Sequence, residues 1–182
     1  MTGRFIAVVG PSGVGKDSVM AAMADRDPRI ALARRVITRP SDAGGEDFDG
    51  VTTDEFDARA AAGQFALNWA AHGLRYAIPI SVQAQLQDGQ DVLANLSRSA
   101  LVRAKDRFAR FDVINLTADR AILAARLAAR GRESADQIAG RLDRASAGLP
   151  DGIAAYEIDN SGALGQAVQA ALDLLYPVSV TR

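Results

Sequence analysis

The chain has 182 residues, which is enough for one domain with a sizeable core and too few for two ordinary domains. The apolar fraction of 48% and charged fraction of 24% are typical of a soluble globular protein, and a net charge of −1 gives no general attraction to nucleic acid or membrane. Zero cysteines exclude disulfide bonds, a single histidine argues against zinc, and no signal peptide or membrane span is visible, so we expect a cytoplasmic protein.

A glycine-rich stretch organises the N-terminal part of the chain. Apolar residues 5–9 predict a buried strand and residues 19–24 predict a helix, with the sequence GPSGVGKDS between them. Glycines permit backbone conformations that aim successive N–H groups at a phosphate chain. The alternative is a turn that only joins the strand to the helix. The spacing favours a loop that binds a chain of phosphates, formed by Gly10, Pro11, Ser12, Gly13, Val14, Gly15, Lys16, Asp17 and Ser18.

The residues after the last glycine of this loop predict catalytic and metal-binding roles. Lys16 is one of only two lysines in the chain, and its compact ammonium group can reach the outer phosphates from the start of the helix. The pattern G-x-x-x-x-G-K-[ST] places a hydroxyl after the lysine, whereas this chain has Asp17 there and Ser18 one residue later. Both side chains offer the oxygen ligands that Mg²⁺ prefers, so we predict that Asp17 and Ser18 hold the metal.

Residues from about 35 to 79 predict a small insert that holds the substrate and can move. We expect a strand over 30–37, a loop over 41–50, a short helix over 53–62, and two strands over 65–71 and 74–78. His72 lies between the last two strands and is interpreted as a turn residue rather than a general base. Arg35 and Arg39 could bind a phosphate ester, and the alternative is a pair of solvated arginines.

The remaining elements alternate between strand and helix. We expect strands over 91–96, 111–116 and 153–158, and helices over 80–87, about 99–107, 120–130, 135–147 and 164–176. This order predicts an α/β fold with a mainly parallel sheet covered on both faces. Asn95 and Arg98 follow the strand over 91–96, at the edge where such sheets bind ligands.

A helical hairpin is expected around Gly131, where a glycine interrupts the helical pattern. Arg130 precedes this break, and Arg141 and Arg144 follow it on neighbouring positions of the next helix. A hinged hairpin could bring these side chains over a phosphoryl group as it transfers, and thereby neutralise the charge that develops. The alternative interpretation is that they are ordinary solvent-exposed charges.

Several motifs in this order resemble the guanylate kinase family. They are the loop GPSGVGKDS, the element Arg35…Thr38-Arg39-Pro40, the hairpin with Trp69 and Tyr76-Ala77-Ile78-Pro79, and the run from Leu127 to Leu142. The resemblance covers nearly the whole chain. It implies a single domain with the three-layer P-loop NTPase fold. The core (1–34, 80–126 and 148–182) would bind ATP, an insert (about 35–79) would bind the acceptor, and a helical lid (about 127–147) would supply arginines.

Three departures from guanylate kinases affect the expected substrate. The stretch 65–69 lacks the glutamate that reads the guanine edge, Phe48 replaces a tyrosine, and Asn95 replaces an aspartate. The loop with Lys-Asp-Ser, the strand ending at Asn95, the Tyr-x-Ile-Pro turn and the ending Ile158-Asp159-Asn160-Ser161-Gly162 are instead similar to the ribose 1,5-bisphosphate phosphokinases. Members of that branch phosphorylate the anomeric phosphate of the sugar to give 5-phosphoribosyl 1-diphosphate, in connection with phosphonate breakdown.

The resemblance therefore implies an ATP- and Mg²⁺-dependent kinase whose partner is a small phosphate acceptor. Ribose 1,5-bisphosphate is the expected acceptor, a nucleoside monophosphate such as GMP is the alternative, and a non-catalytic binding module is a further rival. The oligomeric state stays open, and a homodimer is compatible with the sequence. The expected catalytic residues are Lys16, Arg130, Arg141 and Arg144, and the expected acceptor-binding residues are Arg35, Arg39, Tyr76 and Arg98.

Overall fold

Five parallel strands form the central sheet of the computed structural model, which describes residues 1–43, 46–131, 134–145 and 148–177. The strand order is β2-β7-β1-β8-β9, and β1 pairs with β7 and β8 on its two sides. All five residues of β1 are buried, as expected for a strand with layers on both faces. The strands are β1 (Phe5–Val9), β2 (Ile30–Leu32), β7 (Asp91–Asn95), β8 (Phe111–Thr117) and β9 (Tyr156–Asp159).

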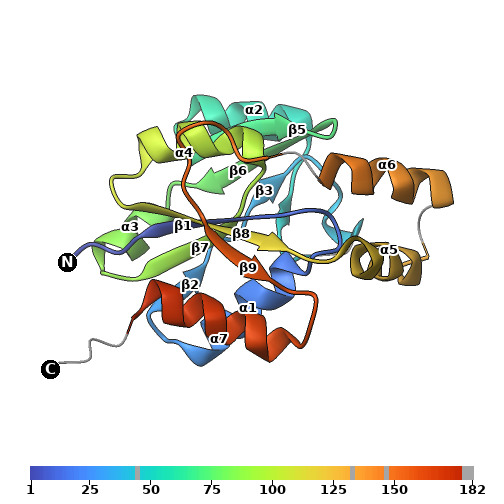
Figure 1. The fold of residues 1–182 in the computed structure, drawn as a ribbon. Helices are drawn as coiled ribbons and strands as arrows, with labels where there is room; N and C mark the ends of the chain where they lie inside the picture. The colour runs from blue at the N-terminus through green and yellow to red at the C-terminus, as the bar shows by residue number, and fades with distance from the viewer. Residues whose placement is uncertain (44–45, 132–133, 146–147, 178–182) are drawn as a thin grey trace, which may run out of the picture.

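The alternation of side chains along β1 divides the core into two layers. Ile6 and Val8 face a cluster formed with α1 (Lys16–Arg26), α5 (Arg120–Ala129) and α7 (Leu164–Leu175). Phe5, Ala7 and Val9 face the opposite cluster, formed with α3 (Val82–Gln87), α4 (Leu101–Arg107) and the hairpin described next. Figure 1 shows α1 and α7 below the sheet and α4 above it. The predicted α/β fold with a covered parallel sheet is confirmed.

A second, four-stranded sheet lies within residues 36–79, in the order β4-β3-β6-β5. Its strands are β3 (Val36–Ile37), β4 (Asp49–Gly50), β5 (Phe65–Ala71) and β6 (Leu74–Pro79), and α2 (Thr53–Ala61) packs Phe56 against it. His72 (φ 53°) and Gly73 (φ 75°) form the tight turn of the β5–β6 hairpin. The predicted place of His72 in a turn is therefore confirmed.

Four predicted boundaries are wrong, and each error has a physical cause. The strand expected over 30–37 is two strands, because Ala33 makes the last bond to the central sheet, to Leu93, and the chain then crosses to the second sheet. The loop expected over 41–50 contains a 3₁₀ turn, η1 (Ser41–Ala43), and the short β4. The residues just before α3 and β9 form turns, with Gln83 N donating to Ile80 O and Ile153 N donating to Pro150 O, so these elements start at Val82 and Tyr156.

Two helices stand beyond the carboxyl ends of the central strands. α5 ends at Ala129, and Gly131 follows with φ 63°, a left-handed conformation that favours glycine. α6 (Ala135–Ala145) packs Leu142 against the core, and Figure 1 shows α5 and α6 together at the end of the sheet to which β8 and β9 point. Within the described residues, no helix has both the length and the apolar character needed to cross a membrane.

Candidate active site

The loop between β1 and α1 has the strained backbone that its glycines predict. Gly13 (φ 84°) and Gly15 (φ 93°) both adopt left-handed conformations. A side chain at Gly10 would bring its Cβ within 2.6 Å of the Leu116 carbonyl oxygen, so the loop passes too close to β8 for any other residue. The loop leads directly into the first turn of α1, where unpaired N–H groups and the helix dipole attract anions.

Two side chains from outside the loop hold its shape, and neither was predicted as a site residue. The Val14 carbonyl accepts hydrogen bonds from Asn160 Nδ2 (2.7 Å) and Arg126 Nη1 (3.3 Å), and Arg126 also donates to the Asn160 carbonyl (2.8 Å). Asn160 lies in the polar turn after β9, which is a visible signal in the sequence. Arg126 carries no such signal, because nothing in the sequence distinguishes it from Arg120, the other arginine of α5.

The Lys16 ammonium group lies inside the loop. Nζ donates to the Gly10 carbonyl at 2.9 Å and to the Pro11 carbonyl at 3.2 Å. Burial lowers the pKa of Lys16 to about 8, because the interior of the loop favours the neutral amine more than water does. An incoming phosphate would supply the negative charge that these neutral carbonyls do not.

Several other charges act on Lys16, which shows that the predicted site residues come together. Asp17 opposes the fall in the pKa of Lys16, whereas three arginines add to it. These arginines come from the chain before β3, from the 3₁₀ turn η2 (Arg98–Ala100) after β7 and from the residue after α5: Arg35, Arg98 and Arg130. A cluster of cations of this kind suits a ligand with several phosphates.

Arg35 is a buried side chain with three kinds of partner. It is only 6% exposed, and it pairs with Glu46 through Nε (2.9 Å) and through Nη2. Nη1 donates to the Asn95 carbonyl at 3.0 Å, and the guanidinium lies over the Tyr76 ring at 5.0 Å from its centre. The alternative interpretation of Arg35 as a solvated charge is therefore wrong.

The other two predicted acceptor arginines are half-buried. Arg39 lies over the Phe48 ring at 4.3 Å from its centre, on the second sheet. Burial lowers the pKa of Arg98, and the carboxylate of Glu157 partly offsets this effect. Glu157 in turn accepts two hydrogen bonds from Asn115 Nδ2, at 3.0 and 2.9 Å.

The predicted metal ligands lie in the first turn of α1, where both are exposed. Asp17 Oδ1 accepts a hydrogen bond from Asn95 Nδ2 at 3.1 Å. A carboxylate and a hydroxyl beside a phosphate-binding loop are hard oxygen donors, and their exposure leaves room for the water molecules that Mg²⁺ keeps. The chemistry of this donor set therefore fits magnesium.

The helix α6 reaches the loop through one arginine. Arg141 Nη1 donates to Ser12 Oγ at 3.2 Å, which connects the predicted lid to the phosphate-binding loop. The salt bridge between Arg120 and Asp143 (2.8 Å) joins α5 to α6. Arg144 belongs to α6, but its side chain lies outside the described residues.

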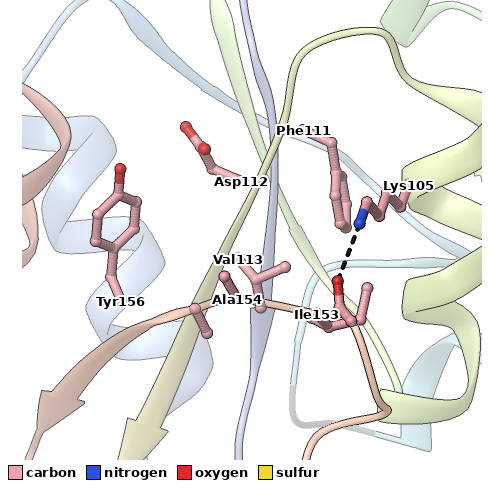
Figure 2. A pocket seen from close by; sticks show the side chains of 9 residues that line it. Lys105, Phe111, Asp112, Val113, Ile153, Ala154 and Tyr156 are labelled. Atoms are coloured by element: carbon pink, nitrogen blue, oxygen red, sulfur yellow. Dashed lines mark hydrogen bonds between the residues drawn. The ribbon is translucent and has the colours of Figure 1, made fainter.

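A cavity of about 310 Å³ lies at the beginnings of β8 and β9, at the end of the strands away from the loop. None of the predicted site residues lines it. Figure 2 shows it beside the start of β8, with Phe111, Val113 and Ile153 around it. Lys105, the second lysine of the chain, donates to the Gly152 carbonyl there at 2.9 Å. The two lysines thus occupy opposite ends of the strands, and only Lys16 is near the loop.

Comparison with known proteins assigns the family. No family model matches the chain, but it is 52% identical over 170 residues to the ribose 1,5-bisphosphate phosphokinase PhnN of Ruegeria sp. (strain TM1040), covering 93% of this chain and 90% of that protein. The chain belongs to the ribose 1,5-bisphosphate phosphokinase family. A second member of this family, from Agrobacterium fabrum, is 45% identical and covers 94% of this chain and 95% of its own length.

The likeness to solved structures extends to guanylate kinases at the level of the fold. The crystal structure of guanylate kinase from Anaplasma phagocytophilum superposes on this ribose 1,5-bisphosphate phosphokinase family member with a TM-score of 0.70 and 16% identity. The match covers 99% of this chain and 88% of that one. The predicted family and the predicted guanylate-kinase-like architecture are both confirmed.

Proposed function

We propose that the protein transfers the γ-phosphoryl group of ATP to the 1-phosphate of ribose 1,5-bisphosphate, giving 5-phospho-D-ribosyl 1-diphosphate and ADP. The observation that carries this proposal, together with family membership, is the gathering of Arg35, Arg98 and Arg130 around Lys16. Lys16 in the glycine-rich loop binds the phosphates of the donor, ATP. The additional guanidinium groups, of which Arg35 is buried, suit an acceptor that is itself rich in phosphate.

The chemical step needs positioning and charge neutralisation more than proton transfer. An oxygen of the acceptor phosphate attacks the γ-phosphorus and forms the new P–O bond, while the bond from that phosphorus to the β–γ bridging oxygen breaks. ADP leaves with the electron pair. Because the attacking oxygen is already ionised, no general base is required, and the residues assigned to charge neutralisation are Lys16, Arg130, Arg141 and Arg144.

Magnesium belongs to the donor side of this proposal. Asp17 and Ser18 are the residues that would hold it, and Mg²⁺ supplies charge neutralisation on the β- and γ-phosphates when it is bound. The residues of the chain do the remainder: the backbone N–H groups of the loop orient the phosphates, and Lys16 supplies a positive charge at the outer ones.

Arg35, Arg39, Tyr76 and Arg98 are assigned to the acceptor. Arg35 is already ordered by Glu46 and Tyr76, so little side-chain entropy is lost when a phosphate binds beside it. Leu67 is buried in β5 and contributes only apolar surface, in the stretch where a base-reading carboxylate would be needed. A sugar bisphosphate fits these residues better than a nucleotide base does.

The test is a comparison of two acceptors with purified protein, ATP and Mg²⁺. We expect ribose 1,5-bisphosphate to be turned over at least about 100-fold faster than GMP, because an acceptor-reading carboxylate is worth a factor of this order. Faster turnover of GMP would overturn the proposal in favour of a nucleoside monophosphate kinase. Failure to bind ATP in calorimetry would instead indicate a binding module.

Lys16→Ala and Lys105→Ala form a matched pair of variants in the same assay. Removing the ammonium group at the loop should lower turnover by at least about 100-fold, as expected for loss of one preorganised cation. The exposed Lys105 lies at the opposite edge of the sheet, so its removal should leave turnover within about threefold of the wild type. Equal effects of the two substitutions would contradict the role of Lys16.

A further inference from the structure

Asn95 contacts both halves of the site from the carboxyl end of β7. Its side-chain amide donates to Asp17 Oδ1 at 3.1 Å, on the nucleotide side. Its main-chain carbonyl accepts from Arg35 Nη1 at 3.0 Å, on the acceptor side. Asn95 is half-buried, and Val8 of β1 is its partner in the sheet, so its position is fixed by the core.

The chemistry of the Asn95 side chain matters because of what it faces. An amide NH₂ group can only donate, so it orients the Asp17 carboxylate without adding charge. A carboxylate at position 95 would have no N–H to donate, so it could not make this hydrogen bond to Asp17. The amide therefore holds the Asp17 carboxylate in place beside the phosphate-binding loop.

We propose that Asn95 is a positioning residue that orients the Asp17 carboxylate toward the magnesium of bound nucleotide, while its carbonyl holds Arg35 on the acceptor side. This inference rests on the proposed function and assigns Asn95 a role that it exerts through Asp17 and Arg35. Residues that orient a metal ligand through a hydrogen bond commonly affect metal affinity by about 10–100-fold.

The two ends of this hydrogen bond are positions at which the chain departs from an expected pattern. Asp17 stands where the pattern G-x-x-x-x-G-K-[ST] has a hydroxyl, and Asn95 stands where the resemblance to guanylate kinases implies an aspartate. Asp17 and Asn95 are in contact, so the pair keeps one carboxylate, at position 17 instead of position 95. Placing the carboxylate at position 95 and a hydroxyl at position 17 should therefore restore part of the Mg²⁺-dependent binding that either single substitution removes.

The experiment measures binding of a non-hydrolysable ATP analogue by calorimetry, with and without Mg²⁺, so that it needs no acceptor and no turnover. The variants are Asn95→Ala, Asn95→Asp, Asp17→Ser, and the double variant with Asn95→Asp and Asp17→Ser. We expect Asn95→Ala to weaken the Mg²⁺-dependent part of binding about 10-fold, and Asn95→Asp to weaken it more. The double variant should bind about 10-fold more tightly than Asn95→Asp alone.

Glu46→Gln is the control from the acceptor side, because Glu46 holds Arg35 from the opposite direction. It should raise the KM for ribose 1,5-bisphosphate and leave Mg²⁺-dependent binding of the analogue within about twofold. The proposal is overturned if Asn95→Ala binds the analogue like the wild type, or if the double variant is no better than Asn95→Asp. Lack of turnover of ribose 1,5-bisphosphate by the wild type would refute the proposed function and leave this calorimetric test intact.

Discussion

Lys16 has a position that makes its charge sensitive to pH. Its ammonium group lies among loop carbonyls, and burial lowers its pKa to about 8. A lysine with such a pKa is mostly protonated at neutral pH and loses its charge as the pH rises through 8. Phosphate binding favours the protonated form, so the free protein should show this ionisation more clearly than the complex.

The consequence is a pH limb in kcat/KM for ATP, which reports ionisations of the free enzyme. We expect kcat/KM to be flat below about pH 7 and to fall by about tenfold per pH unit well above pH 8. Lys16→Arg should have lower activity but no such limb, because arginine stays protonated throughout this range. An identical limb in Lys16→Arg would assign it to another group.

The sequence predicts which residues meet at the site better than it predicts how they are held. Lys16, Asp17 and the loop glycines follow from a short, local pattern. The environment of Arg35 does not, because it depends on Glu46 and Tyr76, which reach it only when the second sheet folds. Arg126 and Asn160 were missed for the same reason, since their common acceptor is a carbonyl far away in the chain.

At the scale of elements, long apolar runs were predicted well and short strands were not. β1, α1 and the β5–β6 hairpin have the predicted positions, because each has its own periodicity and its own glycine signal. β3 and β4 contain two residues each and exist only through pairing with each other and with β6. No local pattern of two residues can indicate a strand, so these depend on tertiary structure.

A cluster of polar side chains connects α7 to the central sheet. The cluster lies at the beginnings of β1 and β7, at the end of the strands away from the loop. Tyr176 Oη donates to Asp91 Oδ2 at 2.7 Å, and Arg4 pairs with the same oxygen at 2.7 Å. Burial raises the pKa of Asp91, but hydrogen bonds from Arg4 and Tyr176 outweigh it and hold that pKa below its ordinary value. Burial also raises the pKa of Tyr176, which keeps this donor protonated at neutral pH.

This cluster should make the free energy of unfolding depend on pH. A depressed pKa in the folded state stabilises the protein above the unfolded value of about 4, and this stabilisation disappears as the pH falls through the folded value. Asp91→Asn should lower the free energy of unfolding by about 3 kcal/mol at pH 7 and flatten its dependence below pH 4. Tyr176→Phe should cost about 1 kcal/mol.

Urea denaturation at pH 3 to 7 measures these changes, with Asp173→Asn as the matched control. Asp173 accepts a hydrogen bond from Gln169 on the exposed side of α7, so its substitution should change the free energy of unfolding by less than about 0.5 kcal/mol. An Asp91→Asn variant that kept the acid dependence of the wild type would assign that dependence to other carboxylates.

At the scale of the whole molecule, a cation-rich region lies between three parts of the chain. These parts are held to the rest of the protein by different kinds of contact. The central sheet carries the loop, the second sheet carries Arg35 and Arg39, and α5 and α6 carry Arg130 and Arg141. The strand that leads into the loop, β1, is firmly held because it is buried throughout and paired on both sides. α6 contacts the loop through a hydrogen bond between two side chains, and a bound ligand could take the place of one of them.

The exchangeable contact is the hydrogen bond from Arg141 to Ser12. When phosphates occupy the loop, the same guanidinium can move from the Ser12 hydroxyl to the transferring group, since a charge-assisted bond to phosphate is stronger than a bond to a hydroxyl. Arg141→Ala should therefore lower kcat by at least about 100-fold and change the KM for ATP by less than about threefold. Steady-state kinetics over both substrates separates the two constants.

Arg120→Ala supplies the control on the same pair of helices. Its salt bridge with Asp143 joins α5 to α6 but is exposed, with 62% and 72% of the two side chains accessible, so its loss should cost less than about 0.5 kcal/mol of stability. If α6 acts only by covering the site, both substitutions should lower kcat equally. If Arg141 neutralises charge on the transferring group, only its own substitution should do so, and Arg141→Lys should recover part of kcat because it retains the positive charge.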